Sequence, residues 1–359
     1  MNIDVKMTYL KYLLLAGAMC AFVSCQREDG PLDLPENKIP IELSAASEWP
    51  DFTKALITSE DDLDGDGFVV WGDLHSNNTI TSVFNGTEVT RETGEWDYSP
   101  KQYWFNGDYY FGALLPASKV KNNISAFITD DGSLKLNGGS ITLGGPDADQ
   151  IDLMYALSGK IENIESKEEY DPIALTFYHL WAQLGFNLQS VEPNDKSFEI
   201  SKITLYGSGL YSSITFSEGE GTEADPDYTL TISENDYQLK RTDLYSNPTD
   251  SINPFATFTP EDGTSWTVGT EAVTLVKGLM VFPVESSEDN SVTVEVTYGN
   301  GKTIKGTIDE VEWLSGKKYI YTLQIGANSI NFSEPTVAKW GEGENFGVDI
   351  NAGIVKEQD

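Results

Sequence analysis

Short runs in which apolar and polar residues alternate recur along most of the chain from residue 38 onward, and they end at Gly, Asn, Asp or Pro. Alternation with a period of two gives a β-strand one apolar face and one polar face. The clearest runs are residues 39–43, 109–115, 291–298 and 318–325. After residue 25 no segment keeps the i, i+3, i+4, i+7 pattern of an amphipathic helix over three turns. The sequence therefore predicts an all-β protein made of antiparallel β-sandwiches.

The length of the chain and a charged stretch near its middle predict two domains. A chain of 359 residues, 39% of them hydrophobic, is long enough for two domains with separate cores. A charged stretch at 159–172 separates two β-rich halves, so we expect an N-terminal sandwich over 39–165 and a C-terminal sandwich over 166–359. Within the second half, the Gly-Asn-Gly-Lys turn at 299–302 predicts a β-hairpin.

The first 25 residues have the features of an export signal. Lys6 and Lys11 precede or flank an apolar run at 12–23 that is too short to span a membrane. The ending Phe-Val-Ser-Cys resembles a bacterial lipobox, which predicts a signal peptide over 1–24 and a lipid such as palmitate on Cys25. Residues 25–38 would then be a tether to the membrane. The alternative is an ordinary secretory signal followed by an accidental cysteine.

Charge and composition exclude several classes of function. The chain has 23 basic and 57 acidic residues and a net charge of −34, so it would repel nucleic acid. Two Cys and two His are too few for a zinc or iron–sulfur cage. No nucleophile motif accompanies His179, and a buried, hydrogen-bonded imidazole is the favoured interpretation. The acidic residues could supply a glycosidase pair, but no spacing singles one out. We therefore expect no enzymatic activity.

One acidic motif has the spacing of a calcium loop. Oxygen ligands fall at positions 1, 3, 5 and 12 of residues 62–73, glycine falls at position 6, and a backbone carbonyl is available at position 7. The candidate ligands are Asp62, Asp64, Asp66, Phe68 through its carbonyl, and Asp73. Asp73 is shorter than the usual Glu, and strand patterns replace the usual flanking helices. The alternative is a solvated acidic turn. No cofactor is expected to be required, and calcium is the ion that this motif would take.

Several segments together resemble the fimbrillin family, the subunits of type V pili of Bacteroidota. They are residues 93–104, 109–116, 152–156, 173–180, 184–188, 313–319 and 330–332, followed by Trp340. The resemblance covers nearly all of the chain after the signal, in the family's order. It implies two consecutive transthyretin-like antiparallel β-sandwich domains, export as a lipoprotein to the cell outer membrane, a surface-exposed place in a fimbrium, and a role in cell adhesion.

The resemblance also implies a way of assembling with other pilus subunits. A trypsin-like protease would cut after a basic residue that follows the first strand, and Lys54 is the candidate. Loss of that strand would open a groove for a neighbour's donor strand. Phe346, Val348 and Ile350 alternate as a donor strand requires. The alternative is that residues 345–350 are merely the last strand of their own domain.

Two functions from different classes follow. The leading hypothesis is a pilus subunit, or a pilus-associated surface lipoprotein, that works by strand addition. The other is a surface lipoprotein that binds glycans through exposed aromatic side chains. The alternative to glycan binding is a structural role for the aromatic side chains, because rings beside strands most often close the core or the edge of a sandwich. The tryptophans concerned are Trp96, Trp104, Trp313 and Trp340.

Overall fold

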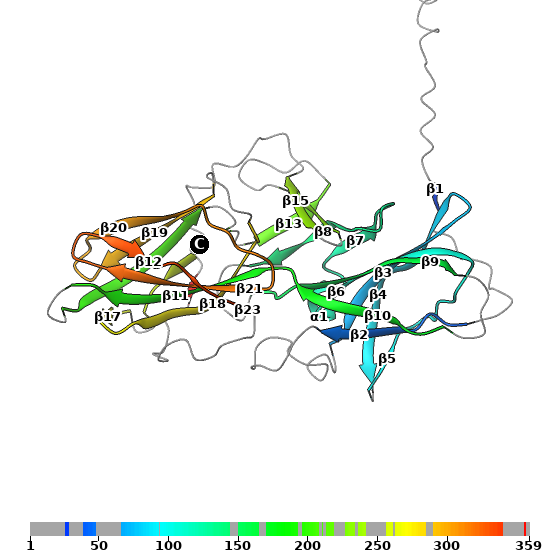
Figure 1. Cartoon of the computed structure of the whole chain (residues 1–359), viewed down its shortest axis with the longest axis horizontal. Coiled ribbons are helices and arrows are strands. Elements are labelled where there is room, and N and C mark those ends of the chain that lie inside the picture. Colours follow the sequence, from blue (N-terminus) through cyan, green and yellow to red (C-terminus); the bar gives the residue numbers. More distant parts are fainter. Residues whose placement is uncertain are drawn as a thin grey trace, which may run out of the picture.

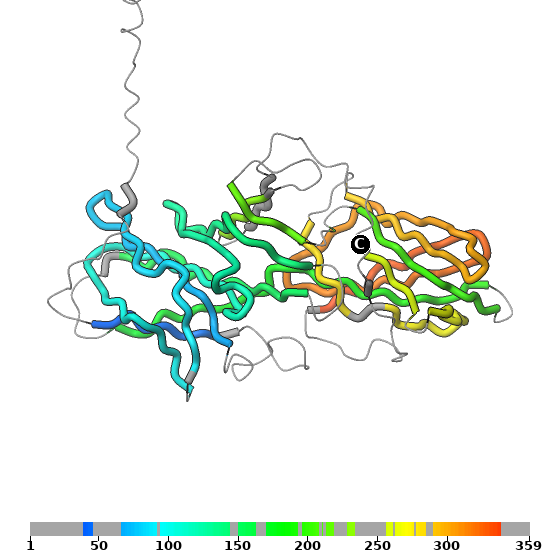
Figure 2. Tube along the Cα trace, turned by 180° about the vertical axis from the view of Figure 1, so that it is seen from behind, coloured from blue at the N-terminus to red at the C-terminus, as the bar shows by residue number. Residues whose placement is uncertain are grey.

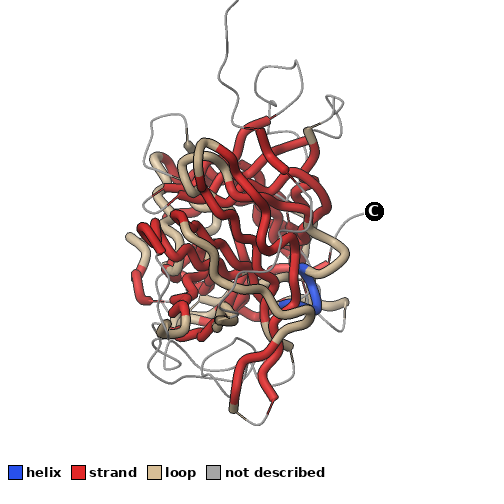
Figure 3. Tube along the Cα trace, turned by 90° about the vertical axis from the view of Figure 1, so that its right-hand side faces the viewer, coloured by secondary structure: helices blue, strands red, loops and turns tan. Residues whose placement is uncertain are grey.

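In the computed structural model, nearly all the described residues belong to β-strands or to the turns between them. The described residues are 26–28, 39–47, 66–92, 94–143, 150–164, 170–192, 196–207, 210, 213–218, 227–233, 236–241, 256–260, 263–284, 290–339 and 355–356. Figure 3 shows strands throughout this part of the chain. The helix among the described residues is α1 (Ala117–Val120). The prediction of an all-β fold is confirmed. No helix among these residues has the length and apolar character needed to cross a membrane.

The largest sheet has eight strands and lies in the N-terminal half. Its order is β1 (Gln26–Glu28), β4 (Thr79–Glu92), β3 (Phe68–Ser76), β6 (Gly107–Leu115), β9 (Met154–Ile164), β10 (Ile173–His179) and β2 (Leu43–Ser47), with β5 (Glu95–Asp97) paired to β4. Its pairings are antiparallel except at the two ends of this order, where β1 is parallel to β4 and β2 is parallel to β10. The central strand β3 is buried along most of its length, because both faces of the sheet are covered.

A second sheet covers one face of the first. Its order is β15 (Asp236–Arg241), β14 (Asp227–Ser233), β13 (Ser213–Ser217), β8 (Leu134–Thr142) and β7 (Ser125–Ile128). The core between the two sheets includes Trp71, Leu114 and Phe216. The pairings cross the expected boundary between 165 and 166, since β10 belongs to the first sheet and β13 pairs with β8. Figure 1 shows β13 and β15 beside β7 and β8.

The C-terminal half is a sandwich of two further sheets. One contains β18 (Val273–Val281), β11 (Ala182–Ser190), β21 (Lys317–Ile325), β22 (Ile330–Phe332) and β23 (Thr336–Lys339). The other contains β20 (Thr303–Asp309), β19 (Ser291–Tyr298), β12 (Phe198–Gly207), β16 (Ala256–Phe258), β17 (Trp266–Val268) and β24 (Val355–Lys356). The predicted hairpin is confirmed as β19 and β20, and its turn contains Gly301 at a φ of 81°.

A short connection joins the two halves. Strand β10 ends at His179, and Leu180 and Trp181 lead directly into β11. Trp181 is fully buried, and its indole N–H donates to the carbonyl of Ile151 at 2.9 Å. Figure 2 shows the N-terminal strands in blue and cyan at one end of the long axis and the orange C-terminal strands at the other. The molecule is therefore a rod of two sandwiches with a packed junction.

Candidate functional site

The candidate site is the edge of the first sheet that residues 39–47 occupy. We call these residues the edge segment. Ile41, Leu43 and Ala45 are buried to 5% exposure or less, whereas Glu42 between them is exposed. This alternation is what a strand with one buried face requires. In Figure 1, β2 lies at the border of the sheet beside β10.

The edge segment is hydrogen-bonded on both of its sides. On one side β2 pairs with β10 in parallel register, from Leu43 opposite Ile173 to Ser47 opposite Phe177. On the other side, the N–H of Ile41 donates to the carbonyl of Gln102 at 2.9 Å. The segment therefore lies in a slot between β10 and the loop at 98–104.

Tyr98 fixes this loop to the edge segment. Its hydroxyl donates a 2.6 Å hydrogen bond to the carbonyl of Ile41 and accepts one from the N–H of Gln102 at 3.2 Å. The side chain is 6% exposed. Burial raises the pKa of Tyr98 to about 12, so the phenol stays protonated and remains a donor at any physiological pH.

Aromatic rings form the floor beneath the edge segment. Phe68 contacts Phe177 at 5.3 Å between ring centroids, and Phe84 contacts Tyr98 at 5.0 Å. Both contacts belong to the same core as Ile41. Burying a side chain such as Ile41 contributes about 1.5–3 kcal/mol. Without the edge segment, this apolar surface and the backbone groups of β10 would face water, so another strand with alternate apolar residues would bind there favourably.

Several predicted site residues lie outside the described residues. They are Cys25, Lys54, Asp62, Asp64, Phe346, Val348 and Ile350. Beyond the predicted donor strand, β24 pairs with β16 through Val355 opposite Phe258. Lipidation, cleavage and strand donation therefore stay predictions.

The structure does describe three of the predicted calcium ligands. Asp66 accepts hydrogen bonds from the N–H and the hydroxyl of Ser118, at 2.6 and 2.7 Å. Phe68 and Asp73 both lie in β3, where five residues of extended chain span about 16 Å. The structure therefore does not bring Asp66, Phe68 and Asp73 around one point. No group of three metal-binding side chains occurs among the described residues, and calcium binding stays a prediction.

The histidine and the tryptophans within the described ranges have structural places. His179 is 2% exposed, and its Nδ1 lies 2.8 Å from a carboxylate oxygen of Asp152, which confirms the buried interpretation. Trp104 and Trp313 are buried as well. Among residues whose burial is described, Tyr178 is the exposed aromatic side chain, at 42%. The described surface therefore lacks the row of exposed rings that the glycan hypothesis assumed.

The sequence predicted a strand at 39–43, within the edge segment, but it did not predict that the loop at 98–104 binds this segment. Tyr98 and Gln102 hold the edge segment on the side opposite β10. The available signal was the aromatic motif at 93–104, which contains both residues. That this motif binds the edge segment could not be predicted, because the hydrogen bond joins residues more than fifty positions apart in the chain.

Comparisons with known proteins add the following findings. A family model described as fimbrillin-like matches residues 53–340. A fimbrial protein from Bacteroides vulgatus has a similar structure, with a TM-score of 0.50 and 14% identity over 84% of this chain and 99% of that one. A putative cell adhesion protein from Bacteroides ovatus has a TM-score of 0.47 and 14% identity, over 84% of this chain and 98% of that one. At 14% identity, the likeness to the first of these structures is one of fold alone. No curated protein matches the sequence.

Proposed function

Because the chain belongs to the fimbrillin-like family, we propose that it is a structural subunit of a surface fimbria, or a lipoprotein associated with one, and supports adhesion. It works as a binding and assembly protein, and no catalytic step is assigned to it. The similar structures named above are described as a fimbrial protein and a putative cell adhesion protein. The observation that carries the proposal is the slot that holds the edge segment between β10 and the 98–104 loop.

Assembly begins in this proposal with hydrolysis of the peptide bond after Lys54 by a trypsin-like protease. The edge segment lies N-terminal to that bond, so only non-covalent contacts would then keep it in the slot. A neighbour's segment with Phe346, Val348 and Ile350 would replace Ile41, Leu43 and Ala45. The edge segment pairs in parallel with β10, and parallel pairing is slightly less stable per residue than antiparallel pairing. A donor strand that enters in the opposite direction would therefore gain stability.

The same cleavage would separate the subunit from its membrane anchor. Cys25, with its lipid, lies in the part that is removed, and so does β1. The lipid would hold the precursor at the outer membrane until the protease acts. Release from the membrane and opening of the slot would then follow from one hydrolysis.

The test is assembly of the purified full-length precursor after treatment with a trypsin-like protease, followed on a gel of native, unboiled protein. We expect ladders from the wild type and from Lys119→Ala, which removes an exposed lysine of α1. Lys54→Ala should stay monomeric and keep its lipid. A variant truncated after residue 340 should be cleaved but should form no ladder.

Two results would contradict parts of this proposal. Ladders from the truncated variant would exclude the C-terminal donor. If the cleaved wild type forms no ladders, alone or mixed with other cleaved subunits of the same fimbria, the assembly role is wrong.

A further inference from the structure

One sheet of the C-terminal sandwich ends, within the described part of the chain, in a strand with a single partner. Strand β20 comes first in the order of its sheet and pairs with β19 along its whole length, from Thr303 opposite Thr297 to Asp309 opposite Ser291. Figure 1 shows β20 and β19 at the opposite end of the molecule from β2. The side of β20 that faces away from β19 is therefore a border of the sheet.

This border presents the backbone groups of alternate residues. In an antiparallel pair, every second residue bonds to the partner strand, and the residues between them turn their N–H and C=O groups outward. The N–H of Tyr298 donates to the carbonyl of Lys302 at 2.8 Å, so the alternation directs residues 304, 306 and 308 to β19. The outward-facing residues are Thr303, Lys305, Thr307 and Asp309, and all four are exposed. Their backbone groups can bond to a further strand.

The side chains leave the backbone of this border accessible. Lysine often protects an exposed strand edge, but Lys305 leans the other way. Its ammonium lies 3.0 Å from a carboxylate oxygen of Glu295 on β19 and 5.4 Å from the centre of the Tyr206 ring on β12. Gly306 has no side chain, and a Cβ there would come within 2.8 Å of the Phe332 ring in the facing sheet. A second strand can therefore approach β20 closely.

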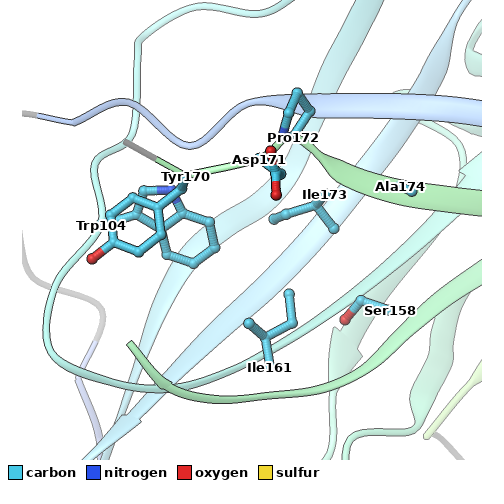
Figure 4. A pocket seen from close by; sticks show the side chains of 8 residues that line it. All are labelled: Trp104, Ser158, Ile161, Tyr170, Asp171, Pro172, Ile173 and Ala174. Atoms are coloured by element: carbon cyan, nitrogen blue, oxygen red, sulfur yellow. The ribbon is translucent and has the colours of Figure 1, made fainter. Parts of the chain in front are cut away.

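Two other places in the described structure, where a strand lacks a neighbour on part of one side, are less open. Strand β10 diverges from β9 inside the first sheet, and the hollow between them is lined by side chains that include Trp104, Tyr170 and Ile161 (Figure 4). Strand β18 is a border strand, but the side chain of Gln150 bonds to its backbone. Neither place offers seven residues of open border, as β20 does.

The sequence of β20 and its flanks is complementary to itself when it is reversed. Lys302 and Lys305 precede the central Gly306, and Asp309 and Glu310 follow it. A reversed copy brings acidic residues to the lysines and lysines to the acidic residues, whereas a parallel copy would place like charges together. The net charge of −34 makes most other contacts between two copies repulsive. A second copy in the antiparallel direction therefore fits this border.

We propose that two copies of this chain associate through antiparallel pairing of their β20 strands, centred on Gly306. In this register Thr303 of one copy lies opposite Asp309 of the other, and Ile304 lies opposite Ile308. The two glycines meet at a position of close approach between the strands, where the absence of side chains leaves room. Ile304 and Ile308 are half-buried, so the pairing covers apolar surface that otherwise contacts water.

The contact acts between fimbriae. A contact through one strand is small and therefore weak, but every subunit of a fimbria carries the same border, so repeated contacts add up. The two-fold pairing reverses the strand direction, and the strands of the C-terminal sandwich run roughly along the long axis (Figure 2). Fimbriae that extend toward each other from two cells have this relative direction when the long axes of their subunits follow the fibre. This consequence rests on the proposed function, whereas the contact between two copies does not involve strand exchange.

The test uses the uncleaved full chain, so strand exchange cannot contribute. Thr303→Cys and Asp309→Cys are made as separate variants, mixed, oxidised mildly and run on a non-reducing gel. Pairing about Gly306 places the Cα atoms of the two cysteines about 5.5 Å apart, within reach of a disulfide. The mixture should give a linked dimer above the background of the wild type, which keeps Cys20 and Cys25. Thr303→Cys alone should stay at that background, because its two copies of residue 303 would lie about 20 Å apart.

Two further changes, each made in both partners of the mixture, test the border itself. Thr307→Pro removes an outward N–H and none of the bonds to β19, so it should abolish the linked dimer. Lys305→Gln removes the attraction to Asp309 of the second copy and should lower the yield about twofold. The matched control is Lys160→Gln, which removes an exposed lysine with an ion pair of the same 3.0 Å length, to Asp108. This control should leave the yield unchanged.

Three results would overturn the proposal. The first is a mixture that gives no more dimer than the wild type. The second is an equal yield when Thr303→Cys is mixed with Glu199→Cys, at an exposed position of β12 away from the border, since random collisions would then explain the link. The third is a yield that neither Thr307→Pro nor Lys305→Gln lowers. Because the chain stays uncleaved, these results do not depend on whether cleaved subunits form ladders.

Discussion

The hydroxyl of Tyr98 donates a 2.6 Å hydrogen bond to the backbone carbonyl of Ile41, fifty-seven positions earlier in the chain. This bond joins the aromatic motif at 93–104 to the strand that closes the sheet edge. Because the acceptor is a backbone oxygen, the bond does not depend on which side chain the edge segment carries. Tyr98 could therefore donate the same hydrogen bond to any strand that places a backbone carbonyl where that of Ile41 lies.

Replacement of Tyr98 by Phe should therefore loosen the edge segment while keeping the ring contact with Phe84. The free energy of unfolding should fall by about 1 kcal/mol, the usual contribution of one hydrogen bond. Urea denaturation followed by far-UV circular dichroism measures this change. Tyr206→Phe removes a partly exposed hydroxyl from β12 and should change stability by less. If both variants lose the same free energy of unfolding, the hydrogen bond from Tyr98 to Ile41 contributes no more than an exposed hydroxyl does.

The slot should accept its own strand as a separate peptide. After cleavage and removal of the N-terminal fragment, a synthetic peptide of residues 39–47 should bind the remaining chain, which calorimetry measures. Leu43→Gln in the peptide should weaken binding at least tenfold, since a polar side chain would enter the apolar core. Glu42→Gln, at the exposed neighbouring position, should have little effect. Similar affinities for the two altered peptides would refute the described orientation of the segment.

The junction between the sandwiches should depend on Gln150. Its side-chain amide accepts from the N–H of Met280 at 2.7 Å and donates to the carbonyl of Gly278 at 3.3 Å, both in β18. Gln150→Ala should lower stability by about 1–2 kcal/mol, because it leaves two backbone groups of β18 without these partners. Gln189→Ala removes an exposed bond to Thr270 and serves as the control. Scanning calorimetry should show a broadened or split transition for Gln150→Ala alone.

Stability should decline at mildly acidic pH partly because of His75. Burial lowers the pKa of His75 from its ordinary value of 6.5, although Asp130 and Asp108 oppose the shift. Below pH 6.5 the unfolded chain binds a proton that the folded chain resists, so stability falls as the pH falls. Melting temperatures at about pH 7.5 and about pH 5.5 measure this term. The decrease should be smaller for His75→Gln. A larger decrease in that variant would show that the sign is wrong.

Asp66 should stabilise the fold with or without calcium, because its carboxylate already accepts two hydrogen bonds from Ser118. Asp66→Ala should lower stability by about 1 kcal/mol in chelator, as expected for loss of a helix-end acceptor. If calcium binds the 62–73 motif, millimolar calcium should raise the melting temperature of the wild type but not of the variant. Identical wild-type melting curves in calcium and in chelator would remove the calcium hypothesis.

The sequence predicts local strand structure well where one face of a strand is buried. Residues 291–298 alternate in the sequence, and β19 alternates between half-buried and buried positions in the same order. The second half of the acidic motif at 62–73 is also a strong strand sequence, which the spacing of its oxygen ligands does not reveal. The residues from Phe68 to Leu74 are all buried in β3, so this half of the motif lies in a strand, and calcium binding by the motif stays a prediction.

The alternation of apolar and polar residues does not predict which strands pair when they lie far apart in the sequence. The charged stretch at 159–172 suggested a domain boundary, yet β10 follows it and returns to the first sheet. Strand β13 pairs with β8 from Ser213 opposite Thr142, across seventy-one positions. Such a choice depends on the total apolar surface that two sheets bury together, and alternation within either strand does not specify its partner.

The two-residue passage from β10 to β11 has a mechanical consequence. A tensile force between the slot and the C-terminal sandwich would act on the nearly continuous backbone of β10 and β11. Strand β10 pairs with the edge segment, and β11 lies between β18 and β21. The load would act along the strand axes, so many cross-strand hydrogen bonds would have to break together rather than one after another. With Trp181 buried at the passage, the joint has little freedom to swivel. A fibre of such units would stretch little under flow and would transmit tension from one subunit to the next.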